Sequence, residues 1–410
     1  MKRTTTLLIL GLLISGGTSS HLRAEVVPQS APVVKMAAAP NAAVIYWQAF
    51  YAIPNLTEEQ KKVLEAAISS DEAPVSDQLK PIFAQYRIAL HEMQRARQVT
   101  PCDWQLDMSA GPELLLPHVQ KLRELSRVSL LRARQRFAEG ENDAAIDDVL
   151  ATLKMARDCA SSPLLISILV NASIEKAAID LLARQLPALT KDQRDRLEKE
   201  LALLPPTVTV ATAMQWEGEI FGTWLKRKLE AEIRQQGNSP SIEKLFAALC
   251  LSIGVPCNLD PKPEDREGQR RAELIRTLSI ADIHAQIDQL SDDFNTLAQI
   301  ASLPIDQRKA KVDAFEKSIE AAKQLKDKAD LRRCLTITAL PSIGNVITRE
   351  EQLHIRRQLL EQALRVLRDG ENSLTPIDGK MVRYQKMAHG FELHLSSSSG
   401  DVILKVGTES

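Results

Sequence analysis

The chain has 410 residues, enough for one large hydrophobic core or two smaller ones. Apolar residues make up 44% of it and charged residues 26%, a globular composition that argues against a largely disordered protein. The 52 Lys and Arg residues are balanced by 53 Asp and Glu residues, so the sequence has neither the basic excess of a dedicated nucleic-acid-binding protein nor a general attraction to anionic membranes.

The first 24 residues have the layout of a secretory signal peptide. Two basic residues precede an apolar run from Leu7 to Ile14, and small and polar residues follow, so cleavage is expected after Ser20 or Ala24. The alternative is an uncleaved membrane anchor, but the apolar run is well short of the roughly 20 residues that cross a bilayer. We therefore expect an exported protein, periplasmic or secreted, with no transmembrane span in the mature chain.

Export would place the cysteines in an oxidising compartment, where disulfides form. Cys250 and Cys257 lie on either side of a turn that contains Gly and Pro, so they are candidates for a local disulfide. The alternative is two separate buried thiols. The chain has five cysteines, so at least one is unpaired in any scheme. No CxxC or HExxH motif occurs and the histidines are scattered, so neither a metal nor another cofactor is expected.

Helical patterning begins at Asn41 and continues along most of the chain. A further helix is expected over residues 77–98. Three helix starts carry Thr followed three residues later by Gln or Glu, the spacing of a capping box, in which each side chain bonds a backbone N–H of the other residue. These pairs are Thr57 with Gln60, Thr190 with Gln193, and Thr348 with Glu351.

The longest strongly patterned stretch, residues 112–204, is expected to form successive antiparallel helices. Gly140 should end the first of them, and the second should run from Asn142 to about Cys159. Ser162 and Pro163 should open the third, because Ser suits an N-cap and Pro suits the first helical turn.

Pro205-Pro206 is the clearest internal boundary, because proline is disfavoured inside a helix and restricts the residue before it. Residues 378–406 alternate apolar and polar residues around turn signals, which predicts two or three antiparallel strands. Between the two, helices are expected over 210–235, 272–302, 305–333 and 348–369, with a polar loop at 256–271 and Gly370 as the final stop.

These elements predict a mainly α fold, a multi-helical body of helical hairpins with a small C-terminal antiparallel β appendage. The expected divisions are a signal peptide (1–24), a flexible lead (25–40), an N-terminal helical domain (41–205), a second helical region (206–370) and a C-terminal β-hairpin (371–410).

Residues from about 125 to 157 resemble one tetratricopeptide unit, a helix pair that turns on a glycine and packs through small residues. The residues that carry this resemblance include Ala133, Phe137, Gly140 and Ala145. The following 34-residue window has Ile174 where the glycine would fall, whereas a repeat array needs about three units. A packed helical hairpin and half of a peptide-binding groove both remain open interpretations.

The C-terminal stretch carries Asp378-Gly379-Lys380, then Tyr384, then Gly390-Phe391, and so resembles the C-terminal hairpin of type II secretion pseudopilins. It departs from that pattern at Met381, where the pseudopilins have proline, and it lacks the acidic tail that can hold calcium. The pseudopilin N-terminal helix with its cleavage motif is also absent. Together with the aromatic stretch from Asn41 and the block from Cys102 to residue 157, these motifs resemble a family of exported bacterial proteins of unknown function. That resemblance implies an exported helical fold and carries over no catalytic residue.

We therefore expect the protein to act by binding a partner. We expect an exported helical scaffold or protein-interaction module of the cell envelope, whose partner is a protein or another envelope component. The candidate interaction surface comprises Trp47, Phe50, Arg132 and Arg136. The alternative for the aromatic stretch is that it anchors an N-terminal helix in the core.

The competing function is an envelope hydrolase that acts on glycan or peptide through carboxylates such as Glu217 or Asp103. The closely spaced pairs, Glu217 with Glu219 and Asp292 with Asp293, are not aimed at one bond, since residues one or two apart on a helix point in different directions. No nucleophile elbow or phosphate-binding glycine loop occurs, so enzymatic activity stays open and no catalytic residue is assigned.

Overall fold

The structure is a computed structural model, and it describes residues 40–69, 76–254, 259–322, 333, 335–336, 343–398 and 400–408. All of them belong to one structural unit, which begins at Pro40. The expected signal peptide and Cys257 lie outside the described residues.

The predicted mainly α fold with a small C-terminal antiparallel sheet is confirmed. The α-helices are α1 (Ala42–Tyr51), α2 (Glu58–Ser69), α3 (Leu79–Gln85), α4 (Arg87–Arg97), α5 (Pro117–Ala138), α6 (Asn142–Cys159), α7 (Leu165–Gln185), α8 (Lys191–Ala202), α9 (Val210–Gln236), α10 (Ile242–Ser252), α11 (Arg266–Arg276), α12 (Ile280–Ser302), α13 (Ile305–Ala322) and α16 (Ile343–Asp369). Short 3-10 helices are η1 (Met108–Glu113), η2 (Leu186–Ala188) and η3 (Glu371–Ser373), and the strands are β1 (Arg383–Met387), β2 (His389–Ser397) and β3 (Gly400–Thr408).

The turn between α5 and α6 follows directly from Gly140. Its φ of 80° is in the left-handed region that glycine adopts without strain. The Gly140 N–H donates to the Phe137 carbonyl at 3.1 Å, and the Glu141 N–H donates to the Arg136 carbonyl at 2.8 Å. These two bonds are the Schellman arrangement that ends a helix. The predicted start of α6 at Asn142 and its end at Cys159 are both observed.

Some helix boundaries differ from the expectations. The helix expected over 77–98 is divided at Tyr86, whose ψ of −1° bends the chain while its buried hydroxyl donates to Glu124 at 2.9 Å. The capping boxes at Thr57 and Thr190 are formed. Thr348, by contrast, lies inside α16, because that helix begins five residues earlier, at Ile343. Part of the expected polar loop at 256–271 is already helical, since α11 begins at Arg266.

The start of α7 is set by a distant residue. Ser162 was expected to cap this helix, but α7 begins at Leu165 and Ser162 makes no capping bond. Instead, the carboxylate of Glu217 in α9 accepts the Leu165 N–H at 2.7 Å. The start of α9 is satisfied in the same way, since Glu350 in α16 accepts the Val210 N–H at 2.7 Å. Both helix starts are therefore completed by tertiary contacts that the local sequence does not reveal.

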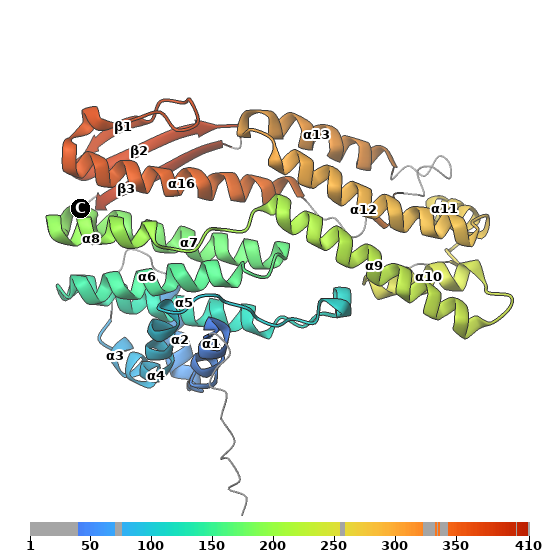
Figure 1. Cartoon of the computed structure of the whole chain (residues 1–410), viewed down its shortest axis with the longest axis horizontal. Helices are drawn as coiled ribbons and strands as arrows, with labels where there is room; N and C mark the ends of the chain where they lie inside the picture. Colours follow the sequence, from blue (N-terminus) through green and yellow to red (C-terminus); the bar gives the residue numbers. More distant parts are fainter. Residues whose placement is uncertain are drawn as a thin grey trace, which may run out of the picture. The chain divides into compact units, whose positions relative to one another are not determined.

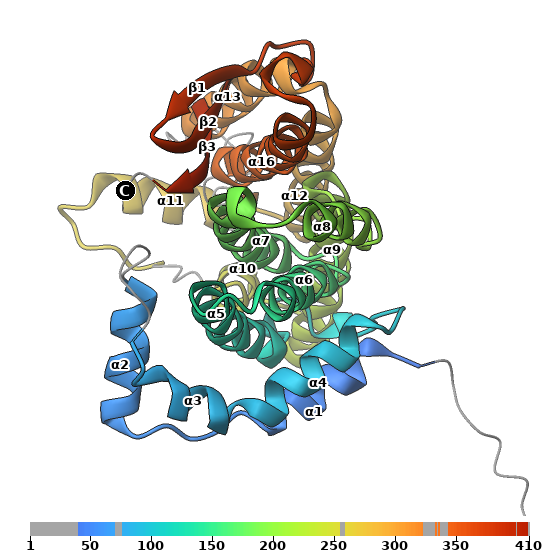
Figure 2. The same ribbon diagram turned by 90° about the vertical axis from the view of Figure 1, so that its left-hand side faces the viewer.

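Helices α5, α6, α7 and α16 lie beside one another in succession, and the sheet covers α16 and α7 (Figures 1 and 2). One face of the sheet enters the same hydrophobic cluster as α5 to α8 and α16. The buried cross-strand pairs of that face are Phe391 with Val406, Leu393 with Leu404, and Leu395 with Val402. The C-terminal strands are thus part of a helical core.

The buried carboxylate of Glu175 joins three helices. It accepts from Arg157 of α6 at 3.2 Å and from Arg357 of α16 at 2.7 Å. The same two arginines also hold the segment between α8 and α9, where Arg157 donates to the Pro205 carbonyl at 2.8 Å and Arg357 to the Thr207 hydroxyl at 3.3 Å. The boundary marked by Pro205-Pro206 is therefore fixed against the helical core.

Candidate functional site

Helix α1 has two apolar faces. Because residues four apart lie on one face of a helix, Tyr46 and Phe50 both point into the core, whereas Trp47 and Tyr51 both point outward. Phe50 is 6% exposed, so the structure places it in the core and not on the surface that the sequence suggested. Trp47 remains on the surface.

The inward face of α1 packs on an aromatic cluster centred on Trp104. This indole stacks on Tyr46 and Phe50 with ring centroids 5.7 and 6.2 Å apart, and on His118 at 4.5 Å. Its Nε1–H donates to the backbone carbonyl of Asp158 at 2.8 Å. Trp104 is thus fixed by stacking on several sides and by a hydrogen bond at its polar edge.

The polar groups in this cluster are paired or uncharged. The hydroxyl of Tyr46 donates to the Asp158 carboxylate at 2.8 Å, and Lys154 forms an ion pair with the same carboxylate at 2.5 Å. Burial, followed by the Asp158 charge, raises the pKa of Tyr46 well above its usual value. Burial lowers the pKa of His118 to about 4, so this imidazole is neutral at pH 7. The cluster is therefore a rigid support for α1.

The outward face of α1 and the neighbouring face of α4 form a continuous apolar surface, which we call the α1–α4 patch. It consists of Val44 (55% exposed), Trp47 (40%), Tyr51 (95%) and Ile88 (54%). The two helices lie side by side at the edge of the helical layers (Figure 2). Besides these four residues, the hollow that they line includes Gln48, Ala52 and Glu92.

Trp47 is held in this patch by the cluster behind it. Its ring meets Phe50, Trp104 and His118 edge-on, with centroids 5.5, 6.1 and 6.4 Å apart. One side of the indole is therefore anchored in the core while the rest faces solvent. An aromatic side chain fixed in this way loses little conformational entropy when a partner covers it.

The two arginines of the predicted interaction surface have a structural role. Arg132 and Arg136 lie on α5, and both donate to the carboxylate of Asp148 on α6. Gln94 of α4 donates to the same carboxylate at 3.1 Å. The Asp148 side chain is fully buried. The arginines therefore hold the α5–α6 hairpin together, and the structure does not bring them to the α1–α4 patch.

Of the four patch residues, Trp47 alone belongs to the interaction surface expected from the sequence. The helical spacing from Trp47 to Val44 and Tyr51 is a signal that could have found those two residues. Ile88 could not be found in this way, because it lies on another helix, α4, and is brought beside α1 by tertiary packing.

No two of the candidate catalytic carboxylates share a hydrogen-bond partner among the described residues. Glu217 is bound by the Leu165 N–H, and burial raises the pKa of its carboxyl to about 7, with no second carboxylate contributing within the described part of the chain. Glu219 is exposed. Asp293 is buried and accepts from Thr336 at 2.7 Å, and Asp103 accepts the N–H of Gln105 in a local turn. Each of these four carboxylates thus has a structural or solvated setting.

Over the residues that the structure describes, no group of three or more His, Cys, Asp or Glu side chains could hold a metal ion. No described helix combines the length and the apolar character needed to cross a membrane. Cys250 is buried in α10, and its proposed bridge to Cys257 lies outside the described residues and stays a prediction.

Comparison with known proteins gives no relative from which to infer a function: no protein-family model matches the chain, and neither a curated protein nor a solved structure matches it.

Proposed function

We propose that this protein is an exported helical interaction module of the cell envelope, which binds a partner protein through the α1–α4 patch. The observation that carries the proposal is that four large apolar side chains, Val44, Trp47, Tyr51 and Ile88, are exposed together on one surface. Contiguous exposed apolar surface is typical of interaction sites in soluble proteins. The proposed compartment rests on the signal-peptide pattern of the first 24 residues.

The composition of the patch favours a protein partner over a membrane or a nucleic acid. Helix α1 contains no charged residue, and Glu92 is the single charged residue among those that line the hollow. Binding to anionic lipid or to nucleic acid requires basic side chains at the contact. Trp and Tyr, by contrast, are enriched in protein interfaces and dominate their binding energy. A partner that presents apolar side chains fits this surface.

The hydrolase alternative gains less support. Glu217 has the raised pKa that a general acid needs, but its carboxylate already accepts the first N–H of α7, and burial accounts for the shift. Glycoside hydrolysis needs a second carboxyl group about 5–10 Å away across a cleft. Glu217 is therefore better explained as part of the α7–α9 contact.

Site-directed photo-cross-linking in the intact envelope tests the proposal. A photo-reactive residue replaces Tyr51 in the patch, or, as the control, Leu203, an apolar residue that is 79% exposed at the end of α8. We expect position 51 to give a discrete adduct with another protein and position 203 to give none. The same adducts from both positions, no adduct from position 51, or a product containing two copies of this chain would contradict binding of a separate partner at the patch.

A further inference from the structure

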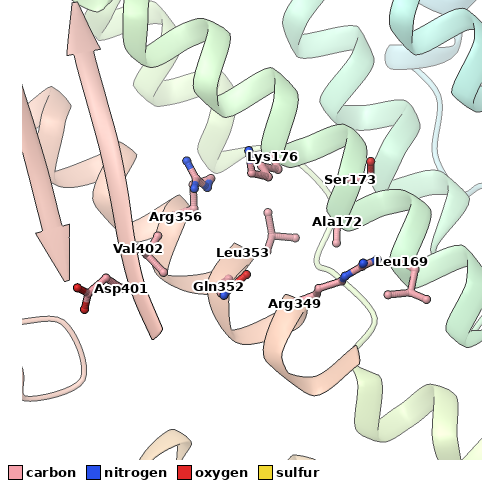
Figure 3. Close-up of a pocket in the computed structure, with 10 residues that line it drawn as sticks. All are labelled: Leu169, Ala172, Ser173, Lys176, Arg349, Gln352, Leu353, Arg356, Asp401 and Val402. Carbon is pink, nitrogen blue, oxygen red and sulfur yellow. The ribbon is translucent and has the colours of Figure 1, made fainter. Parts of the chain in front are cut away.

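A second hollow lies between α7, α16 and β3, three elements that are far apart in the sequence (Figure 3). Its volume is about 360 Å³, which is within the range of small-molecule sites. We call it the α7–α16 groove. Its floor is formed by two buried apolar residues, Leu353 of α16 and Val402 of β3.

Three cationic side chains line the groove: Lys176 of α7, and Arg349 and Arg356 of α16. Asp180 forms ion pairs with Lys176, at 2.8 Å, and with Arg356. The single negative charge of Asp180 is therefore shared between two positively charged side chains. Asp401 also lies at the rim, but its carboxylate is turned away from Leu353 (Figure 3). The charges that face the groove are predominantly positive.

Arg349 is the exceptional residue of the three. It has no ion-pair or hydrogen-bond partner among the residues that the structure describes. Its side chain extends from α16 toward α7, near Leu169 (Figure 3). Arg356 lies two helical turns further along α16, so roughly 10 Å separates the two positions along the helix axis. Leu353 lies between them. A planar guanidinium with unused donors thus stands at one end of an apolar floor.

We propose that the α7–α16 groove binds a small organic anion, with its carboxylate or phosphate group on Arg349 and a short apolar body over Leu353 and Val402. Guanidinium binds either group through two parallel hydrogen bonds, which gives both strength and orientation. The apolar floor adds the burial of several methylene groups of the ligand, which strengthens binding. An inorganic anion can bind only to the guanidinium of Arg349, without contact to the apolar floor, and should bind more weakly.

Calorimetric titration of the whole mature protein at constant ionic strength tests this proposal. The probes are hexanoate and hexyl phosphate, with acetate and inorganic phosphate as the matched anions without an apolar body. We expect saturable binding of hexanoate or of hexyl phosphate, and the one that binds more tightly identifies the anionic group. Either should bind at least tenfold more tightly than its matched small anion.

Two substitutions in the groove, compared with a control elsewhere, test where the anion binds. Arg349→Gln should weaken binding about tenfold or more, whereas Arg127→Gln, which changes an exposed arginine on α5, should leave it unchanged. Lys176→Gln, at an exposed position in the groove, gives a second measurement if Arg349→Gln alters folding, and should also weaken binding. Equal affinity in the wild type and both groove variants, absence of saturable binding, or equal binding of the small anions would overturn the proposal.

Discussion

The indole of Trp47 meets the indole of Trp104 edge-on, with ring centroids 6.1 Å apart. Trp104 is buried and bonded to the Asp158 carbonyl, whereas Trp47 is partly exposed in the α1–α4 patch. The contact therefore links the surface to the core of the N-terminal helices. Changes behind the patch can alter how Trp47 is presented, and the interaction surface depends on the packing of α1 against this cluster.

Removal of the carboxylate at the centre of the α5–α6 hairpin should destabilise the protein strongly. Asp148→Asn leaves Arg132 and Arg136 without their buried counter-charge, which should lower the free energy of unfolding by about 3 kcal/mol. Urea denaturation measures the loss. Asp192→Asn, at an exposed position in the first turn of α8, is the control and should cost below about 1 kcal/mol. Equal losses in both variants would show that the Asp148 pairs do not stabilise the hairpin.

Two glycine substitutions should differ in cost. At Gly140 a Cβ atom meets nothing within 4 Å, so Gly140→Ala costs the strain of φ 80° alone, about 1 kcal/mol. At Gly390 a Cβ atom would lie 1.9 Å from the Val406 carbonyl oxygen, so Gly390→Ala should cost clearly more. Thermal unfolding of the two variants compares them. A larger loss for Gly140→Ala would contradict the geometry at both glycines.

The pKa of Glu217, raised by burial to about 7, predicts a pH dependence of stability. Since the folded state holds this proton more tightly than the unfolded state, the stabilising contribution is complete below about pH 4.5 and is lost as the pH rises through 7. Glu217→Gln keeps an acceptor for the Leu165 N–H but does not titrate. Relative to the wild type, it should gain up to about 3 kcal/mol between pH 4 and pH 8.

The matched control is Glu230→Gln, which changes an exposed carboxylate on the same helix, α9. Its stability difference from the wild type should stay constant over this range. Unfolding curves at several pH values give the comparison. If Glu217→Gln shows the same flat difference as the control, the pKa of Glu217 is the same in the folded and unfolded states and its buried setting is not as described.

The export hypothesis predicts a processed N-terminus. Mass spectrometry of the protein recovered from the envelope should show a chain that begins near Ala24. A version with Lys2 and Arg3 replaced by Asp should be exported less efficiently, because the basic residues precede the apolar run of the signal peptide. Recovery of exported protein that retains Met1 would be incompatible with cleavage.

Much of the fold could be predicted from local sequence signals. The glycine turn at Gly140, the capping box at Thr190 and the three strands depend on residues close together in the chain, and all are observed. The start of α7 could not be predicted, because its first N–H is satisfied by Glu217, which is 52 residues away. Local sequence preferences favoured Ser162 as the N-cap of α7, but the helix begins at Leu165, where the tertiary hydrogen bond to Glu217 is made.

The candidate sites were harder to predict for a related reason. An aromatic run such as Tyr46 to Tyr51 does not reveal which rings face solvent until the packing of α1 is known. In the structure, Phe50 points into the core. The α7–α16 groove has no sequence signature at all, because two of its lining residues, Lys176 and Arg349, are 173 positions apart in the chain. The resemblance to tetratricopeptide units and pseudopilins remains a prediction.

The central claim is that the protein binds a partner through the α1–α4 patch. The most direct test is the yield of the cross-link from position 51 in proteins that carry one further substitution. Trp47→Ala should reduce the yield at least tenfold, and Ile88→Ser should reduce it as well, with helical content and melting temperature recorded for each. Trp216→Ala removes a tryptophan that is 48% exposed on α9 and should leave the yield unchanged. An undiminished yield in folded Trp47→Ala and Ile88→Ser proteins would contradict the claim.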